Sequence, residues 1–367
     1  MIDLKLKTPE QVTFESTLRK RIVGQDDAVG QVSEMYERVL AGMIDEHKPL
    51  CNMLFLGPTG VGKTLLVQAV AEAIHEDMDA LTVINCAEYS EDHQIARIIG
   101  APPGYIGHDT TEPVICPTNL TRGWKENGPK ISILLFDEVE KAAPSLHQLM
   151  LGIMAKGSMV DGKNRILNLT RCMVFMTSNV GSRAINQEHI GYKKHSVERE
   201  FKAITNEALA AAKKKFDPEF LGRITNTVMF RTLTKDELEK ILDLELWMVY
   251  ERALRAMIGR PEYGGNVRNI FTLAVTDTMR EFLLTQGPNK RYGARSLGKS
   301  VDQYVTQTLA TIIATKQVVI PGTVVLDVKD GVVSAEFKEV ADGQRILRAA
   351  IETVEAKETE FKHGEVG

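Results

Sequence analysis

The chain has 367 residues, of which 43% are hydrophobic and 26% charged, and a formal net charge of −4. This composition is typical of folded domains, and the length is sufficient for two or more separate cores. The nearly balanced charge gives no indication of a nucleic-acid partner. The sequence also shows no apolar secretion signal and no apolar run long enough to span a membrane. We therefore expect a cytoplasmic protein with no nucleic-acid and no membrane partner.

The cysteines Cys51, Cys86, Cys116 and Cys172 show no CxxC spacing of the kind that zinc sites and redox pairs use. Three of them lie in or beside strongly apolar segments. We therefore predict buried free thiols in preference to a disulfide or a zinc site.

Short apolar runs recur through the first part of the chain, separated by segments of helix length. The runs cover residues 52–57, 81–86, 131–138, 171–179 and 226–230. Continuous apolar runs of this length are typical of buried parallel strands, because helices cover both faces of such a sheet. The pattern predicts an α/β domain with a parallel five-stranded sheet.

The pattern changes near Thr234. This threonine and the acidic turn that follows it predict the start of a long helix over 234–258. Further elements are expected after it: helices at about 271–285 and 295–315, and two short strands within 317–337 that turn at Asp330-Gly331. These elements predict a second, smaller α+β domain that is mainly helical.

Four segments follow from this organisation. They are an N-terminal extension (1–20), a large domain (21–232), a small domain (233–338) and a charged tail (339–367). Both a marginal helix and disorder are compatible with the sequence of the tail.

The segment GPTGVGKT fits the pattern G-x-x-x-x-G-K-[ST], and an apolar strand precedes it and a helical pattern follows it. Its residues are Gly57, Pro58, Thr59, Gly60, Val61, Gly62, Lys63 and Thr64. The glycines let backbone N–H groups turn toward phosphate oxygens, the lysine supplies a positive charge, and the threonine hydroxyl can bind Mg²⁺. The alternative is a plain turn between a strand and a helix.

Polar side chains end the next two long apolar runs. Asp137 and Glu138 follow ILLF, and Asn179 ends MTSN. Asp137 can hold hydrated Mg²⁺ and Glu138 can orient an attacking water, while Asn179 can donate a hydrogen bond to that water or to a phosphate. Alone, two acidic residues after a strand are often a solvated loop, but beside a phosphate loop they indicate nucleotide hydrolysis.

A loop with the sequence GAPPGYIGHD, residues 100–109, presents one large ring, that of Tyr105. Prolines and glycines exclude a regular helix or strand there. Loop tips are usually small and polar, so a function for this ring is expected.

Together these segments resemble the Clp-type AAA+ unfoldases, and in particular the second ATPase module of ClpB and ClpA. The motifs that carry the resemblance occur in the family's order: RIVGQDDAV, GPTGVGKT, GAPPGYIG, LLFDEVEKA, DGKNR, MTSNVGS, FDPEFLGRI and RYGARSL. They extend over about nine tenths of the chain. The resemblance implies a P-loop NTPase fold of AAA+ type with a small lid domain, using ATP and Mg²⁺.

The resemblance also implies roles for residues whose own patterns say little. Val23 would pack on the adenine, and Arg223 would be the arginine finger that reaches a neighbouring subunit's nucleotide. Arg295 would be the sensor arginine that contacts nucleotide in cis. Taken alone, each arginine would be read as an ordinary surface or helix-start residue. A finger supplied in trans requires a homo-oligomeric ring, which in this family is a hexamer.

For the loop at residues 100–109 the family implies a substrate contact: Tyr105 and Ile106 would line a central channel and grip a translocating polypeptide. The alternative is that Tyr105 packs on its own domain. The chain departs from the family after His108, where about seven additional residues, including Pro113 and Pro117, predict a longer and stiffer loop.

The segment Ile190, Gly191 and Tyr192 fits loosely the tripeptide with which ClpA-like proteins dock on a peptidase ring, and a loop with a buried isoleucine is the alternative. The chain also lacks the preceding domains of ClpA and ClpB, so we expect either a single-ring relative or a fragment.

Three functions are compatible with these features. The leading hypothesis is an ATP-dependent unfoldase or disaggregase, and the second is an ATP-driven remodeller of one dedicated partner complex. A nucleotide-gated scaffold without turnover is disfavoured because every catalytic position is filled.

Overall fold

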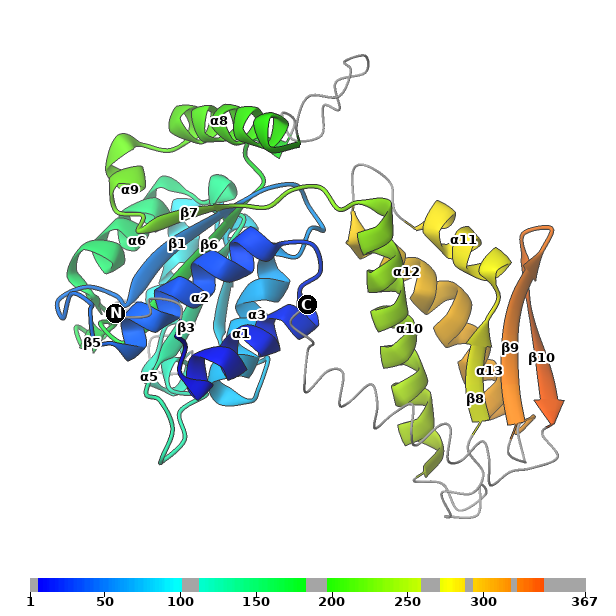
Figure 1. Cartoon of the computed structure of the whole chain (residues 1–367). Helices are drawn as coiled ribbons and strands as arrows, with labels where there is room; N and C mark the ends of the chain where they lie inside the picture. Colours follow the sequence, from blue (N-terminus) through cyan, green and yellow to red (C-terminus); the bar gives the residue numbers. More distant parts are fainter. Residues whose placement is uncertain are drawn as a thin grey trace. The chain divides into compact units, whose positions relative to one another are not determined.

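The computed structural model describes residues 6–100, 112–182, 197–258, 271–287, 293–317 and 322–339. The chain divides into two compact units, Met1–Thr232 and Leu233–Gly367 (Figure 1). Within the described ranges, no helix is both long enough and apolar enough to cross a lipid bilayer.

Five parallel strands form the sheet of the first unit, in the order β2-β3-β6-β1-β7. They are β1 (Cys51–Leu56), β2 (Thr82–Asn85), β3 (Ser132–Asp137), β6 (Cys172–Ser178) and β7 (Asn226–Met229). Each strand matches one of the five apolar runs to within one residue at either end. The predicted parallel five-stranded sheet is therefore confirmed.

Alternate side chains of the strands face two helical layers, as expected for a sheet that is covered on both sides (Figure 1). The first layer contains α1 (Pro9–Arg21), α2 (Asp26–Leu40) and α3 (Lys63–His75). The second contains α6 (Pro144–Lys156), α8 (Val197–Lys215) and α9 (Pro218–Gly222). Phe55 and Phe175 face the first layer, whereas Leu54 and Val174 face the second.

Shorter elements complete the first unit. They are α4 (Ala96–Ile99), α5 (Pro117–Leu120), single 3₁₀ turns at Cys86–Glu88, Asp92–Ile95 and Val139–Lys141, and a hairpin of β4 (Ser158–Val160) with β5 (Ile166–Asn168). The hairpin contains the DGKNR motif in its turn, where the buried Asp161 accepts hydrogen bonds from the backbone N–H groups of Lys163 and Arg165. Although burial alone would raise it, the pKa of Asp161 is lowered by these bonds and by the Arg165 guanidinium.

The N-terminal segment packs as part of the first unit. Thr8 caps α1 through its hydroxyl, and Phe14 and Leu18 from that helix are buried in the core. The ring of Phe14 stacks on that of Tyr36 from α2 with 4.0 Å between centroids. Residues 9–21 therefore belong structurally to the large unit.

The second unit contains a bundle of helices and a small sheet. Its helices are α10 (Lys235–Ile258), α11 (Asp277–Gln286), α12 (Ala294–Val301) and α13 (Gln307–Ala314), with a π-helical turn at Asp302–Thr306. Thr234 caps α10 as predicted, because its hydroxyl accepts a hydrogen bond from the Glu237 N–H. The strands β9 (Gly322–Lys329) and β10 (Val332–Glu339) form an antiparallel pair around Asp330 and Gly331, both at positive φ.

The prediction of a helix over 271–285 is wrong in its first part. Phe271–Val275 form strand β8, which pairs in parallel with β9 and extends the hairpin to three strands. Phe271 is fully buried in the core of the unit, and Thr276 caps α11 immediately after the strand. FTLAV combines aromatic and β-branched residues with good helix formers, so pairing with β9 decides its conformation.

All four cysteines are buried free thiols, as predicted. Burial raises the pKa of Cys172 to about 12. Burial, together with the carboxylates of Asp137 and Glu140, raises the pKa of Cys86 to about 12. The thiols of Cys86 and Cys172 are therefore protonated at neutral pH.

Candidate functional site

The segment GPTGVGKT forms the turn between β1 and α3. Gly60 and Gly62 adopt positive φ angles of 78° and 102°, which disfavour any residue with a side chain. A Cβ atom added to Gly57 would lie 2.6 Å from the carbonyl oxygen of Phe230. The loop therefore requires glycine, and it ends at the N-terminus of α3, where backbone N–H groups and the helix dipole favour an anion.

Lys63 lies inside this turn and is buried, with 8% of its surface exposed. Its Nζ atom donates hydrogen bonds to the carbonyl oxygens of Gly57 and Pro58, each at 2.7 Å, and to Asn179 Oδ1 at 2.9 Å. A buried ammonium that donates to these three neutral oxygens can exchange them for phosphate oxygens without leaving its place. The loop and this charge fit a nucleotide phosphate.

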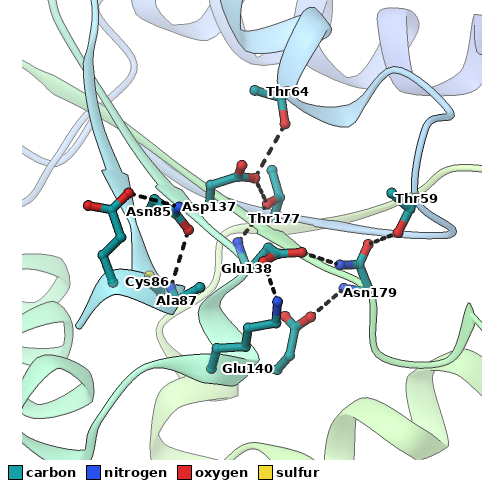
Figure 2. Close-up of polar contacts among 12 residues, drawn as sticks. Thr59, Thr64, Asn85, Cys86, Ala87, Asp137, Glu138, Glu140, Thr177 and Asn179 are labelled. Atoms are coloured by element: carbon teal, nitrogen blue, oxygen red, sulfur yellow. Dashed lines mark hydrogen bonds and ion pairs between the residues drawn. The ribbon is translucent and has the colours of Figure 1, made fainter. Parts of the chain in front are cut away.

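Asp137 ends strand β3 beside the start of α3. The Thr64 hydroxyl donates to Asp137 Oδ1 at 3.3 Å, and the Thr177 hydroxyl donates to the same oxygen (Figure 2). A hydroxyl and a carboxylate are the oxygen ligands that Mg²⁺ prefers. Thr64 and Asp137 are therefore the residues that would hold a magnesium ion at this site.

Glu138 follows Asp137 in a left-handed backbone conformation, with φ of 58°. This conformation is costly for a residue with a side chain, and here the Glu138 N–H is fixed by the Thr177 hydroxyl at 3.0 Å. Asn179 Nδ2 donates to Glu138 Oε1 at 3.0 Å (Figure 2). Lys141 Nζ lies 2.6 Å from Glu138 Oε2. Both oxygens of the carboxylate are thus engaged by donors.

Asn179 connects the phosphate loop to the acidic turn. Its Oδ1 atom accepts hydrogen bonds from Lys63 and, at 3.3 Å, from the Thr59 hydroxyl. Its backbone N–H donates to Glu140 Oε1 at 3.1 Å (Figure 2). A single amide therefore touches both the cation of the phosphate loop and the carboxylate of Glu138.

Two family models match the chain, one in each unit. The model described as an AAA domain of the Cdc48 subfamily matches residues 48–227. The model described as the C-terminal, D2-small domain of ClpB protein matches residues 233–326.

Curated relatives agree with these models. The chain is 34% identical over 303 residues to the "ATP-dependent Clp protease ATP-binding subunit ClpC" of Staphylococcus epidermidis (strain ATCC 12228 / FDA PCI 1200), which is 82% of this chain and 34% of that protein. The ClpC of Staphylococcus aureus (strain USA300) is 33% identical over the same share of both chains. The chain belongs to the Clp-type AAA+ ATPases. It spans about a third of the length of these ClpC proteins.

The solved structure of another protein of this type has the same fold. A cryo-electron-microscopy reconstruction of Hsp104 in a closed state, with ATPγS and FITC casein, superposes with a TM-score of 0.71. The sequence identity is 28%, and the match covers 91% of this chain and 53% of that one. The architecture of a Clp-type AAA+ module therefore extends through both units.

The predicted arginines and Val23 are not among the residues that form the contact network around Lys63. Arg223 follows α9, and its side chain pairs with Glu219 at 2.8 Å. Arg295 is exposed in the first turn of α12, in the second unit. Val23 is half-buried in the connection between α1 and α2.

Two predicted contact sites lie outside the described residues. They are Tyr105 with Ile106, predicted to contact substrate, and Ile190 with Gly191 and Tyr192, predicted to dock on a peptidase.

Sequence reasoning missed several polar residues of this Clp-type module. Thr177 and Glu140 fall inside the motifs MTSN and DEVEK, but their roles depend on how the strands align. Gln25 is buried, and its side chain donates to the carbonyl oxygens of Val61 and Arg231 at 3.3 and 2.9 Å. Gln25 directly follows Ile-Val-Gly, the motif that contains Val23. That motif suggested only that Val23 contacts adenine, and it gave no role for Gln25.

Proposed function

We propose that this chain is the ATP-driven module of a ring that unfolds polypeptides by threading them through a central channel. The observation that supports it best is the Asn179 side chain, which contacts both Lys63 and Glu138. An amide in this place can respond to the outer phosphate and reposition the carboxylate at the same time. Hydrolysis would thus be coupled to the occupancy of the phosphate loop.

In this proposal the site residues divide the chemistry among them. Lys63 and the backbone of the phosphate loop bind the phosphates, and Thr64 and Asp137 hold Mg²⁺, which supplies charge neutralisation when bound. Glu138 orients and polarises the attacking water, and Asn179 fixes that water or the outer phosphate. All five residues lie at the carboxyl edge of the parallel sheet, where ligands of open α/β folds bind.

Oligomerisation completes the proposed site. Arg223 would enter the nucleotide site of the neighbouring subunit, and Arg295 would contact its own nucleotide, while Val23 would pack on the adenine. A closed ring, which we propose is a hexamer, supplies each site with one such Arg223.

The described residues on either side of the segment that carries Tyr105 are hydrogen-bonded within the first unit. On one side, Gly162 N–H in the β4–β5 hairpin donates to the Ile99 carbonyl at 2.7 Å. On the other, Val114 and Ile115 N–H groups donate to the carbonyls of Arg97 and Ile98 at 3.1 and 3.0 Å. Residues 101–111 therefore begin and end on the α/β unit that would bind ATP.

The experiment compares Tyr105→Ala with Tyr105→Phe, which keeps the ring. We expect Tyr105→Ala to lose unfolding of a tagged fluorescent substrate while retaining most of its ATPase activity, and Tyr105→Phe to retain both. Undiminished unfolding by Tyr105→Ala would sink the proposal.

The insertion after His108 favours a second candidate function, remodelling of one dedicated partner complex, because it changes the segment next to the proposed substrate contact. A Glu138→Gln variant, which would bind ATP without hydrolysing it, separates the two. Pull-down of many unfolded proteins supports general unfolding, and pull-down of a single partner supports the second function.

A further inference from the structure

Asn52 is a buried amide inside an otherwise apolar strand. The other five residues of β1 are hydrophobic, and Asn52 is 4% exposed. The strand leads directly into the phosphate loop at Gly57. A buried amide destabilises a core unless its polar atoms are hydrogen-bonded, so its contacts are expected to explain its presence.

The contacts of Asn52 all point to the segment that contains Arg223. Asn52 Nδ2 donates to the Arg223 carbonyl oxygen at 3.2 Å, and the Asn52 N–H donates to Thr225 Oγ1 at 3.1 Å. The Thr225 N–H in turn donates to the Asn52 carbonyl at 2.7 Å. A carbonyl oxygen can only accept, so the nitrogen of the amide must face Arg223. We call these three bonds the Asn52 clamp.

Among the described residues, the other hydrogen bonds and the ion pair of Arg223 lie within its own short turn. Arg223 N–H bonds the Phe220 carbonyl, and its guanidinium pairs with Glu219 from the same turn. Strand β7 begins at Asn226, so the bond from Asn52 to Arg223 lies outside the β1–β7 ladder. It therefore adds a specific anchor that sheet formation does not need.

The orientation of the amide leaves its other end unpaired. In the described part of the chain, Asn52 Oδ1 is buried and has no hydrogen-bond partner. A leucine would fill a comparable volume without this cost. The presence of an amide at this position is therefore explained by its bond to Arg223 better than by packing.

We propose that Asn52 is a positioning residue that holds Arg223 in place for the nucleotide of the neighbouring subunit. The inference rests on the proposed function, in which Arg223 acts in trans. Because β1 ends at the phosphate loop, the clamp also links the strand beside a subunit's own nucleotide to the arginine that it offers to its neighbour. Asn52 would then connect two sites of the ring.

The test uses Asn52→Leu in the full chain, with Thr225→Val as a second variant that removes only the hydroxyl acceptor. We expect unchanged affinity for a fluorescent ATP analogue, unchanged KM for ATP and a kcat reduced about 10- to 100-fold, because misplacing a charge-stabilising group slows chemistry more than binding. An unchanged kcat in both variants would overturn the proposal. If Asn52→Leu does not fold, Asn52→Ala, which also removes the donor to the Arg223 carbonyl, provides the same comparison.

Rings assembled from two different variants distinguish two explanations for a low kcat: a misplaced Arg223, or damage to the nucleotide site of the Asn52→Leu subunit itself. Asn52→Leu subunits keep Glu138, and Glu138→Gln subunits keep Arg223 and its clamp. Mixing the two impaired proteins should raise ATPase activity above that of either alone. In mixed rings a correctly held Arg223 of a Glu138→Gln subunit can enter a site that still has Glu138. No restoration, while Arg223→Ala mixed with Glu138→Gln is restored, would show that Asn52 acts on its own site and overturn the inference.

The same control tests the proposed function separately. If Arg223→Ala mixed with Glu138→Gln stays inactive, Arg223 does not act in trans, and the clamp loses its proposed purpose. If that mixture is restored, the role of Arg223 stands whatever the result for Asn52.

Discussion

Lys141 Nζ lies 2.6 Å from Glu138 Oε2, while Asn179 Nδ2 binds the other oxygen of the same carboxylate at 3.0 Å. The hydrogen bond to Glu138 raises the pKa of Lys141, so its ammonium stays charged at neutral pH. Each oxygen of Glu138 already accepts one hydrogen bond, so an attacking water has to share an oxygen with one of these donors or displace it. Lys141 therefore restrains the proposed base in this state.

Replacing Lys141 with methionine should raise the basal ATPase rate a few-fold, because one oxygen of Glu138 becomes available and loses a neighbouring positive charge. The measurement is steady-state kcat without substrate polypeptide. Lys48→Met is the matched control, since Lys48 forms an exposed pair with Asp45 at the same sequence spacing. A fall in kcat for Lys141→Met would mean that the ammonium helps Glu138 rather than restraining it.

Gln25 joins the phosphate loop to the end of the first unit through Val61 and Arg231. Its replacement with leucine leaves buried backbone groups without these partners, so we expect the free energy of unfolding to fall by about 1–3 kcal/mol. The change in the free energy of unfolding is measured from the unfolding transition of the first unit in urea. Gln31→Leu, at a half-buried position on α2, should have a much smaller effect, and equal effects of both variants would argue against the role of Gln25.

Gly57→Ala should destabilise the chain by about 1–3 kcal/mol and weaken ATP binding, because the new methyl group would collide with the backbone of Phe230. Gly30→Ala provides a contrast of opposite sign. A Cβ atom there meets no other atom within 4 Å, and the position is inside α2, so we expect stabilisation of about 0.5–1 kcal/mol. Similar melting temperatures for both variants would contradict this reading of the loop.

His75 predicts a loss of stability in mild acid. Burial lowers its pKa, with Lys125 acting in the same direction, although its ring nitrogen bonds the Ile131 carbonyl at 2.9 Å. The unfolded chain takes up a proton near pH 6.5 that the folded chain resists, so stability present above that pH is lost as the pH falls below it.

The measurement for His75 is the unfolding free energy between pH 8 and 5.5. The wild type should lose stability below about pH 6.5 with a slope that His75→Gln reduces by up to about 1.4 kcal/mol per pH unit. His93→Gln, at an exposed position, should leave the slope unchanged. An identical slope in wild type and His75→Gln would exclude His75 as the cause.

The sequence predicted the sheet well because buried parallel strands are short continuous apolar runs, and β3 and β6 are clear examples. It failed for Phe271–Val275, whose residues fit both a strand and the start of a helix until the pairing with β9 is known. It also gave no indication of α1, because the apolar residues of that helix are few and only Phe14 and Leu18 are buried.

For the site, Lys63, Asp137, Glu138 and Asn179 were predictable, since a motif or the end of an apolar strand marks each of them. They lie close together because the parallel strands that carry or precede them end at the same edge of the sheet. Asn52 was not predictable: it is one polar residue in an apolar run, and its partner lies 171 positions away. Contacts of this kind depend on the neighbouring strand, which local sequence does not specify.

The central claim, that ATP drives a ring of these chains to thread polypeptide, is tested most directly by electron microscopy of the Glu138→Gln variant with ATP and an unfolded polypeptide. The account predicts closed rings with extended density in the channel, adjacent to Tyr105 of successive subunits. ATP-bound chains that remain single, or rings whose channel stays empty while polypeptide binds elsewhere, would contradict it.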